Sequence, residues 1–378
     1  MNFTEERKMF VKRTRLLALV LAFAMTLTLL AGCGKAPAEA TTEATEETTE
    51  ATTEATTEET TEETTEETEP PVLYRNPLTG VPMDAPLERR IFAVSVNNVP
   101  AALPHVGTQE AGVIFEMYTN GYITRWLALF TDVESVETVG SVRSIRMNFT
   151  DIAQAYDTIV AHAGGSEMVL RDVYSSGIDH FNVDTQTSTY YSFRDKTRLA
   201  ASKDWEHILF AKGAGLYQRA EERGIDITAD PEKDYGFSFV DDGTPAGGED
   251  ATLININFKL KTHTKVSTLT YDEEAGNYIF TQYGKTADEV GKDNTETFEN
   301  VFVMLCEVKG IDVYHVATLQ GSGEGYYACG VKIIPILWSR EGDEDPFHFT
   351  LTDGTPLSQG VGNSYIAIVP TTSEVVYE

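Results

Sequence analysis

Two arginines and a glycine-rich turn lie close together in one stretch of the sequence, Gly140 to Ser166. Arg143 and Arg146 precede a run whose apolar residues repeat every three to four positions, which predicts that a helix follows them. The N-terminus of a helix is the positive end of its dipole, so a guanidinium there is unfavourable by about 0.3–1 kcal/mol unless a negative group faces it. The pair therefore predicts an anionic partner, which is either a carboxylate of the protein or the carboxylate or phosphate of a ligand.

The end of the same stretch has features of an anion site. A short strand is predicted from Thr158 to Ala161, and a second amphipathic helix follows Ser166. The glycines between them allow a tight turn, and the first N–H groups of a helix have no partner within it. The candidate ligand-binding residues are Arg125, Arg143, Arg146, His162, Gly164, Gly165, Ser166 and Arg194.

The evidence for catalysis is weaker. Ser166 could act as a nucleophile with His162 as its base, but the Gly-x-Ser-x-Gly motif is missing, and a serine in this position more often caps the next helix. We therefore assign no catalytic residue and leave enzymatic activity open. The sequence has no cysteine and histidine spacing typical of zinc sites, so no metal and no other cofactor is expected.

The N-terminus carries the most specific signal in the sequence. Basic residues precede an apolar run, Leu16 to Leu30, and Leu30-Ala31-Gly32-Cys33 stands at its end. This pattern resembles the signal peptide of bacterial lipoproteins, in which the cysteine is lipidated after cleavage. The run is shorter than the ~20 residues of a membrane-spanning helix. Residues 1–32 are therefore expected to be removed, leaving Cys33 as a lipid anchor on the outer face of the cell membrane.

A low-complexity segment of Thr, Glu and Ala follows, at residues 33–70. It has no large apolar side chains to bury and its like charges repel each other, which predicts a disordered tether. The whole chain has a formal net charge of −30, and acidic residues also outnumber basic ones after the tether. Nucleic acid is therefore not expected as a partner, because its binding requires basic surfaces.

After the tether, the patterns predict an α+β fold. Residues 71–235 alternate short strands with amphipathic helices, which is typical of a layered α/β domain. The composition around Ile225 to Asp250 shifts to Asp, Gly and Pro, so a domain boundary is expected near residue 235. Residues 236–378 read as a mainly β domain. Cys306 and Cys329 lie in its strands, either as a disulfide or as two buried thiols.

Two helix starts are also predicted. Ser144 has a residue type that favours an N-cap, and it precedes the helix after the arginines. Asp204 is expected to cap a longer helix that runs to about Arg223, with Trp205 facing the core.

Several motifs follow one another in the order found in the YerB-like lipoproteins. They are Asn76-Pro-Leu-Thr-Gly80, Gly121-Tyr-Ile-Thr-Arg125, Gly140-Ser-Val-Arg-Ser-Ile-Arg146, His162-Ala-Gly-Gly-Ser166 and Phe193-Arg-Asp195. The resemblance extends from about Asn76 to Pro370. It implies an extracytoplasmic protein of Gram-positive bacteria that is built from two parts of unknown function, and it supplies no catalytic residue. One departure is Leu199-Ala-Ala-Ser-Lys-Asp204, where the family has a histidine.

Three functions are compatible with these observations. The favoured one is a lipoprotein that binds an anionic component of the cell envelope, or a partner protein, through the arginines. The first alternative is a hydrolase or phosphotransferase that acts on cell-wall polymers and holds its substrate with Arg143 and Arg146. The second is an interaction module that uses only the β domain.

Overall fold

The computed structural model describes residues 74–201, 204–285 and 295–378. The expected signal peptide, Cys33 and the tether lie outside the described residues. No helix within the described ranges is long and apolar enough to cross a membrane. From Glu69 to Glu378 the chain forms one compact unit.

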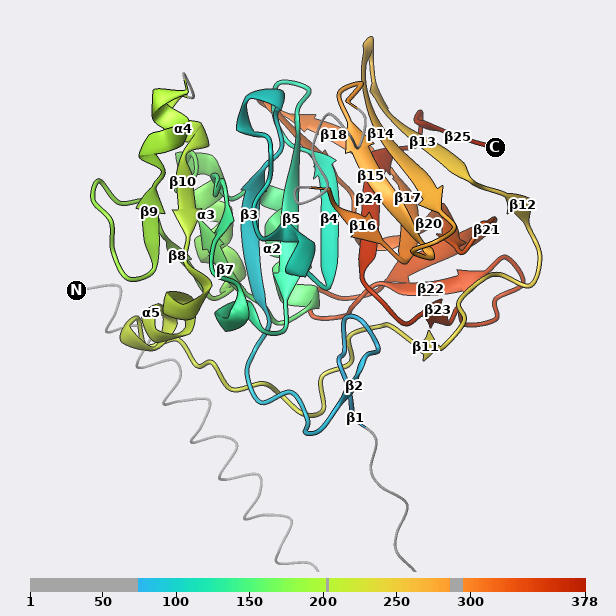
Figure 1. Ribbon diagram of the computed structural model, residues 1–378, viewed down its shortest axis with the longest axis horizontal. Coiled ribbons are helices and arrows are strands. Elements are labelled where there is room, and N and C mark those ends of the chain that lie inside the picture. Colours follow the sequence, from blue (N-terminus) through green and yellow to red (C-terminus); the bar gives the residue numbers. More distant parts are fainter. Residues whose placement is uncertain (1–73, 202–203, 286–294) are drawn as a thin grey trace, which may run out of the picture. The chain divides into compact units, whose positions relative to one another are not determined.

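A sheet of eleven strands runs through this unit (Figure 1). Its strand order is β12-β21-β20-β17-β24-β4-β5-β3-β7-β8, and β22 pairs with β21. The strands that come from the first half of the unit are β3 (Phe92–Asn97), β4 (Val113–Tyr118), β5 (Thr124–Phe130), β7 (Ile159–His162) and β8 (His180–Asn182). Those from the second half are β12 (Glu249–Asp250), β17 (Asn300–Cys306), β20 (Gly321–Cys329), β21 (Lys332–Arg340), β22 (His348–Leu351) and β24 (Ser364–Pro370).

The two halves of the chain share this sheet. β24 lies beside β4 in parallel, with Ser364 opposite Val113 and Ile368 opposite Met117. The boundary expected near residue 235 therefore falls inside one compact unit whose central sheet takes strands from both sides of it.

Smaller sheets complete the β structure. A five-stranded sheet has the order β16 (Thr297–Phe298), β15 (Asn277–Gln282), β14 (His263–Asp272), β13 (Leu253–Leu260) and β25 (Glu374–Tyr377). A three-stranded sheet has the order β6 (Val139–Gly140), β10 (Leu209–Ala211) and β9 (Ser192–Arg194). The two-stranded pairs are β1 (Tyr74–Arg75) with β2 (Pro82–Met83), β11 (Phe239–Val240) with β23 (Gln359–Gly360), and β18 (Val308–Ile311) with β19 (Tyr314–Ala317).

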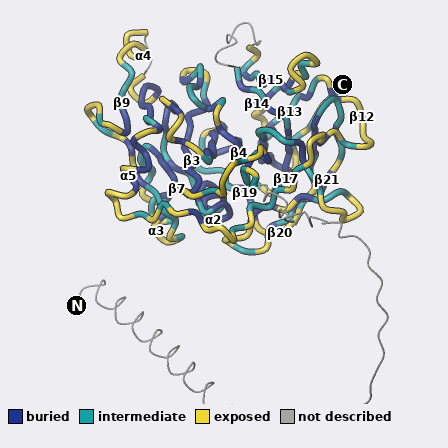
Figure 2. The backbone as a smooth tube through the Cα atoms, turned by 60° about the horizontal axis from the view of Figure 1, so that its bottom comes forward, coloured by how far each residue is buried: buried dark blue, intermediate teal, exposed yellow. Residues whose placement is uncertain are grey.

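Both faces of the central sheet are covered at β3, β4 and β5, which explains why these strands are buried along their whole length. Figure 2 shows this burial at β3 and β4. Alternate residues of β3 belong to different apolar clusters, because successive side chains of a strand point to opposite faces. Val94 packs in a cluster with residues of β13, such as Ile256. Ala93 packs in a second cluster with Phe149 and Val169. These two belong to the helices α2 (Met147–Ala155) and α3 (Glu167–Ser176).

The predicted α+β class and the mainly β second half are confirmed. Cys306 and Cys329 are free, buried thiols. The predicted helix from Asp204 to Arg223 is wrong. This segment instead forms the 3₁₀ turn η4 (Trp205–His207), strand β10, the 3₁₀ turn η5 (Gly213–Gly215) and helix α5 (Leu216–Glu222).

The physical reason lies in residues 208–211, whose consecutive apolar side chains are all buried. A helix of the length predicted would turn some of these side chains to solvent, whereas β10 places residues 209–211 between β6 and β9. Trp205 does not face the core as predicted, because its exposed fraction is 47 %. The remaining short helix is α4 (Lys196–Ala200).

Candidate functional site

Three of the predicted arginines meet at one edge of the central sheet. β3, β7 and β8 are parallel, so their carboxyl ends lie at the same edge. Arg125, at the start of the antiparallel strand β5, pairs with Asn97 at the end of β3. The N–H of Arg143 donates to the carbonyl of Ser95 over 2.7 Å. The carboxyl edge of parallel strands is where open α/β sheets usually bind their ligands.

Ser144 contributes its backbone to this edge and does not cap the helix. The prediction that it is the N-cap is wrong, because α2 begins at Met147 and its N-cap residue is Arg146, whose side chain makes no capping bond. The carbonyl oxygen of Ser144 instead accepts from Arg125 Nη1 over 2.7 Å and from Arg146 Nη1 over 3.1 Å. Hydroxyl Oγ of Ser95 donates to the same oxygen over 3.2 Å. The chain before α2 is therefore held extended by contacts to the sheet.

Arg125 is a buried cation whose exposed fraction is 1 %. Among the residues that the structure describes, it forms no ion pair, and its Nε is buried without a hydrogen-bond partner. Burial lowers the pKa of Arg125 well below its usual value, and the nearby charges of Arg146 and Arg143 lower it further. A buried charge is strongly disfavoured without a counter-charge, so this guanidinium favours an anion beside it.

Arg146 is held by neutral acceptors. Its Nε and Nη2 donate to Asn120 Oδ1 over 3.1 and 3.0 Å, and its Nη1 donates to the carbonyl of Ile145 over 2.9 Å. Its guanidinium lies 5.8 Å from the centre of the Tyr314 ring. Burial lowers the pKa of Arg146 to about 10. Like Arg125, it has no carboxylate partner within the described part of the chain.

Arg143 is the member of the group that has a carboxylate. Its Nη2 lies 2.7 Å from Glu206 Oε2, and the Glu206 side chain is 51 % exposed. An ion pair this exposed contributes about 0–1 kcal/mol to stability. The Nε of Arg143 is buried and has no partner in the described structure. We call Arg125, Arg143 and Arg146 the arginine cluster.

Arg194 is occupied by other contacts. It pairs with Asp184, donates to the carbonyl of Trp205 over 2.7 Å, and lies 4.2 Å from the centre of the Trp205 ring. Arg194 is connected to the arginine cluster indirectly. It contacts Trp205, and the next residue in the chain, Glu206, pairs with Arg143. The structure gives it a role in fixing this turn.

His162 ends β7, and the turn after it runs beside the arginine cluster. The N–H of Ile145 donates to the carbonyl of Gly164 over 3.0 Å. The imidazole Nδ1 of His162 lies 2.9 Å from that same oxygen, and its Nε2 lies 2.9 Å from His180 Nδ1. Burial first and the charge of His180 second lower the pKa of His162 to about 4. Both ring nitrogens are thus engaged, and neither serves Ser166.

Ser166 caps α3, because its Oγ accepts from the N–H of Val169 over 3.4 Å. Gly164 has a φ of +67°, in the left-handed region that favours glycine. Gly165 packs so closely that a Cβ there would lie 3.2 Å from the Leu170 side chain. These residues shape the turn, and the geometry offers no nucleophile and base pair between His162 and Ser166.

Comparison with known proteins identifies the family. A model described as protein of unknown function (DUF3048), N-terminal domain, matches residues 78–226, and the corresponding C-terminal model matches residues 254–366. The chain belongs to the DUF3048 family. The YerB-like resemblance inferred from the motifs is thereby confirmed.

Two comparisons with individual proteins agree with this assignment. The chain is 27 % identical over 299 residues to "Putative lipoprotein YerB" of Bacillus subtilis (strain 168), covering 78 % of this chain and 86 % of that protein. The crystal structure of YerB from Bacillus subtilis has a similar fold, with a TM-score of 0.66 and 24 % sequence identity. That similarity covers 80 % of this chain and 99 % of the YerB chain.

A buried polar network connects the two DUF3048 regions, and the patterns above did not predict it. Glu116 of β4 is completely buried and lies 2.6 Å from the Nζ of Lys265 in β14. It also accepts from the hydroxyl of Tyr365 in β24 over 2.6 Å and from Asn98 Nδ2 over 3.0 Å. Burial alone would raise the pKa of Glu116, but Lys265 and the hydrogen bonds outweigh it and lower the pKa. The sequence did contain a sign of this network, because Glu116 is a single charged residue in an otherwise apolar strand.

Proposed function

We propose that this DUF3048 protein is a lipid-anchored extracytoplasmic protein that binds an anionic group through the arginine cluster. The group belongs to a cell-envelope component or to an acidic segment of a partner protein. In both cases the chemistry recognised is an oxyanion, either a phosphate or a carboxylate. The observation that carries the proposal is Arg125, a buried guanidinium with no carboxylate partner among the described residues.

The anchor is supported by the sequence before the folded unit. The Leu30 to Cys33 pattern is typical of a lipidation site, and the Bacillus subtilis relative carries the name of a lipoprotein. Stable anchoring requires more than one acyl chain, which a lipidated N-terminal cysteine provides. The proposed position is the outer face of the cell membrane, with the acidic segment up to residue 70 as a spacer.

Arg143 is the member of the arginine cluster that an anion from solvent can reach. Its side chain is 23 % exposed, and the carboxylate that it holds is more exposed still. A phosphate carries more charge than Glu206 and accepts two parallel bonds from one guanidinium. The incoming anion replaces Glu206 on Arg143 and offsets the repulsion among the three cations.

Titration calorimetry at low ionic strength tests this proposal, with inorganic phosphate and acetate as the two probes. We expect saturable binding of at least one probe, and a loss of affinity of about tenfold or more in the double variant Arg143→Ala, Arg146→Ala. The matched control is Arg171→Ala, because Arg171 is exposed on α3 and pairs only with the exposed Glu167 within the described ranges. If the double variant is folded and binds as the control does, the arginine cluster is not the site.

A further inference from the structure

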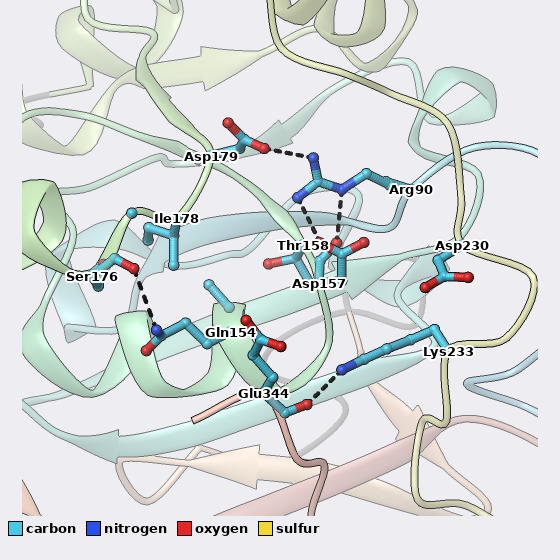
Figure 3. A pocket seen from close by; sticks show the side chains of 12 residues that line it. Arg90, Gln154, Asp157, Thr158, Ser176, Ile178, Asp179, Asp230, Lys233 and Glu344 are labelled. Carbon is cyan, nitrogen blue, oxygen red and sulfur yellow. Dashed lines mark hydrogen bonds and ion pairs between the residues drawn. The ribbon is translucent and has the colours of Figure 1, made fainter. Parts of the chain in front are cut away.

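A hollow lies at the edge of the same parallel strands that is opposite the arginine cluster (Figure 3). Arg90 precedes β3, Thr158 directly precedes β7, and Asp179 directly precedes β8. Their side chains line a cavity of about 360 Å³, together with Gln154 from α2 and residues of the loops that carry Lys233 and Glu344. We propose that this cavity binds a small polyhydroxylated molecule that carries an amino group, that is, a ligand of the amino-sugar class.

Arg90 forms a fixed wall of the cavity. Its Nη1 lies 2.6 Å from Asp179 Oδ2, its Nη2 lies 2.8 Å from Asp157 Oδ1, and its Nε donates to the carbonyl of Asp157 over 3.1 Å. Its Nη1 also donates to the carbonyl of Asp226 over 2.9 Å. With its donors engaged, Arg90 has no role in binding an anion, and it holds Asp157 and Asp179 at the cavity wall.

The remaining charges favour a cation. Lys233 donates to the backbone carbonyl of Glu344 over 2.6 Å, which leaves the carboxylate of Glu344 out of this bond. Neither Asp230 nor Glu344 forms an ion pair with any residue that the structure describes. Four carboxylates therefore line the cavity against two cations, one of which is Arg90. A ligand ammonium group between Asp230 and Glu344 reduces this imbalance.

Thr158 supplies an independent observation that points to a polar ligand. Its exposed fraction is 1 %, and its Oγ1 is buried without a hydrogen-bond partner in the described structure. Buried hydroxyl groups are nearly always hydrogen-bonded. Figure 3 shows Thr158 at the cavity wall beside Asp157 and across from Gln154, whose Nε2 makes only a long 3.4 Å bond to the carbonyl of Ser176.

The mixture of donors and acceptors identifies the rest of the ligand. Gln154, Thr158 and Lys233 can donate, while the carboxylates can only accept. Ligand hydroxyl groups do both, so a polyol satisfies side chains of either kind. No group of three or more metal-binding side chains in the described ranges is arranged to hold a metal ion, which favours an organic occupant. The cavity volume is near the lower end of the ~300–1,000 Å³ that small-molecule sites occupy.

Ligand-observed NMR and calorimetry with D-glucosamine test this inference on the intact protein. We expect saturable binding in the millimolar range, and affinities for glucose and for ethanolamine that are each at least about threefold weaker. Asp230→Asn and Glu344→Gln should each weaken glucosamine binding by about threefold or more. The matched control is Glu273→Gln, which removes one carboxylate from an exposed turn far along the chain.

Three outcomes would overturn the inference. They are no saturable glucosamine binding up to about 50 mM, unchanged affinity in both cavity variants, and binding of glucose or ethanolamine as tight as that of glucosamine. The arginine cluster lies at the other edge of the strands. The double variant Arg143→Ala, Arg146→Ala should therefore bind glucosamine like the wild type, which separates this test from the phosphate titration.

Discussion

Arg125 and Arg146 donate to the same backbone oxygen, that of Ser144, over 2.7 and 3.1 Å. One carbonyl can accept both bonds, but it carries only a partial charge and cannot neutralise two cations. The repulsion is visible in the pKa of Arg125, which burial and then Arg146 lower. The arginine cluster is thus stabilised by neutral acceptors and left short of negative charge, which is the basis of the proposed anion site.

Replacing Arg125 by methionine separates a binding role from a structural one. Methionine fills a similar volume without the charge, and removing an uncompensated buried ion is often neutral or stabilising. The Ser144 oxygen keeps Arg146 and Ser95 as donors. We expect Arg125→Met to change the free energy of unfolding in urea by less than about 1 kcal/mol, or to raise it, while phosphate binding weakens.

The contrary result is that Arg125→Met lowers the free energy of unfolding by more than about 2 kcal/mol. This would indicate that Arg125 stabilises the fold without a bound anion. Arg171→Met is a suitable comparison, because that arginine is exposed on α3. Its substitution should leave both stability and phosphate binding close to the wild-type values.

Removing the charge of Glu116 should, in contrast to removing that of Arg125, destabilise the protein. Glu116→Gln leaves the ammonium group of Lys265 buried, with its exposed fraction at 8 %, and without a counter-charge. Breaking a buried pair in this way costs about 3–5 kcal/mol. We expect a loss of this size in the free energy of unfolding measured by urea denaturation.

Glu374→Gln is the matched control, since Glu374 pairs with Lys259 across the exposed face of the five-stranded sheet at 3.0 Å. Its loss should change stability by less than about 1 kcal/mol. Equal effects of the two substitutions would show that the Glu116 pair does not hold the two DUF3048 regions together.

Local patterns predicted much of the fold. The buried strands of the first half, the turn at Gly164 and the Ser166 cap of α3 all follow from short-range spacing, and the structure contains them. The helix from Asp204 failed because apolar side chains on consecutive residues do not distinguish a buried strand from a buried helix. The pairing of β24 with β4 joins residues about 250 positions apart, and no local pattern carries that information.

The candidate site was predictable only in part. The arginine motifs indicated that Arg125, Arg143 and Arg146 matter, and the sheet brings them to one edge. The carboxylate partner of Arg143 was not predictable, because an acidic chain contains many carboxylates. Glu206 lies beside Arg143 because of the turn at Trp205, which is a feature of the folded chain. The side chain of Ser144 is of a type that caps helices, but its backbone carbonyl accepts from the arginines instead. The reason is that the preceding residue, Arg143, donates its N–H to the carbonyl of Ser95 in β3, so the chain is still bound to the sheet at this point.

His162 should make the protein less stable in acid. Its folded pKa of about 4 lies below the value of 6.5 for an unperturbed histidine, so the unfolded chain takes up the proton first. The stability that depends on neutral His162 is therefore complete above pH 6.5 and is lost as the pH falls toward 4, by at most about 1.4 kcal/mol per pH unit.

The variant His162→Gln should show a shallower decrease in urea stability between pH 6.5 and 4. The decrease should not vanish, because burial also lowers the pKa of His105 to about 4. In NMR spectra of the wild-type protein, the His162 imidazole should titrate near pH 4. A midpoint near 6.5 would contradict the burial of His162 and its contact with His180.

Glu296 should make stability depend on pH with the opposite sign, between about pH 4.5 and 8. Glu296 is buried, and the hydroxyl of Thr108 donates to its Oε1 over 2.6 Å. Burial raises the pKa of Glu296 to about 8, whereas an unperturbed glutamate has a value of 4.5. The native state therefore keeps a proton that the unfolded chain has already lost, and stability should fall as the pH rises from about 4.5 to 8.

Glu296→Gln tests this directly, because glutamine is neutral at every pH and can still accept from Thr108. Urea denaturation at pH 5, 6, 7 and 8 should show a slope in the wild type that is steeper than in the variant, by at most about 1.4 kcal/mol per pH unit. The two proteins should have similar stability near pH 5 and the variant should be the more stable at pH 8. Parallel profiles would mean that Glu296 is ionised in the folded protein, which its burial among Thr108, His105 and Trp126 disfavours.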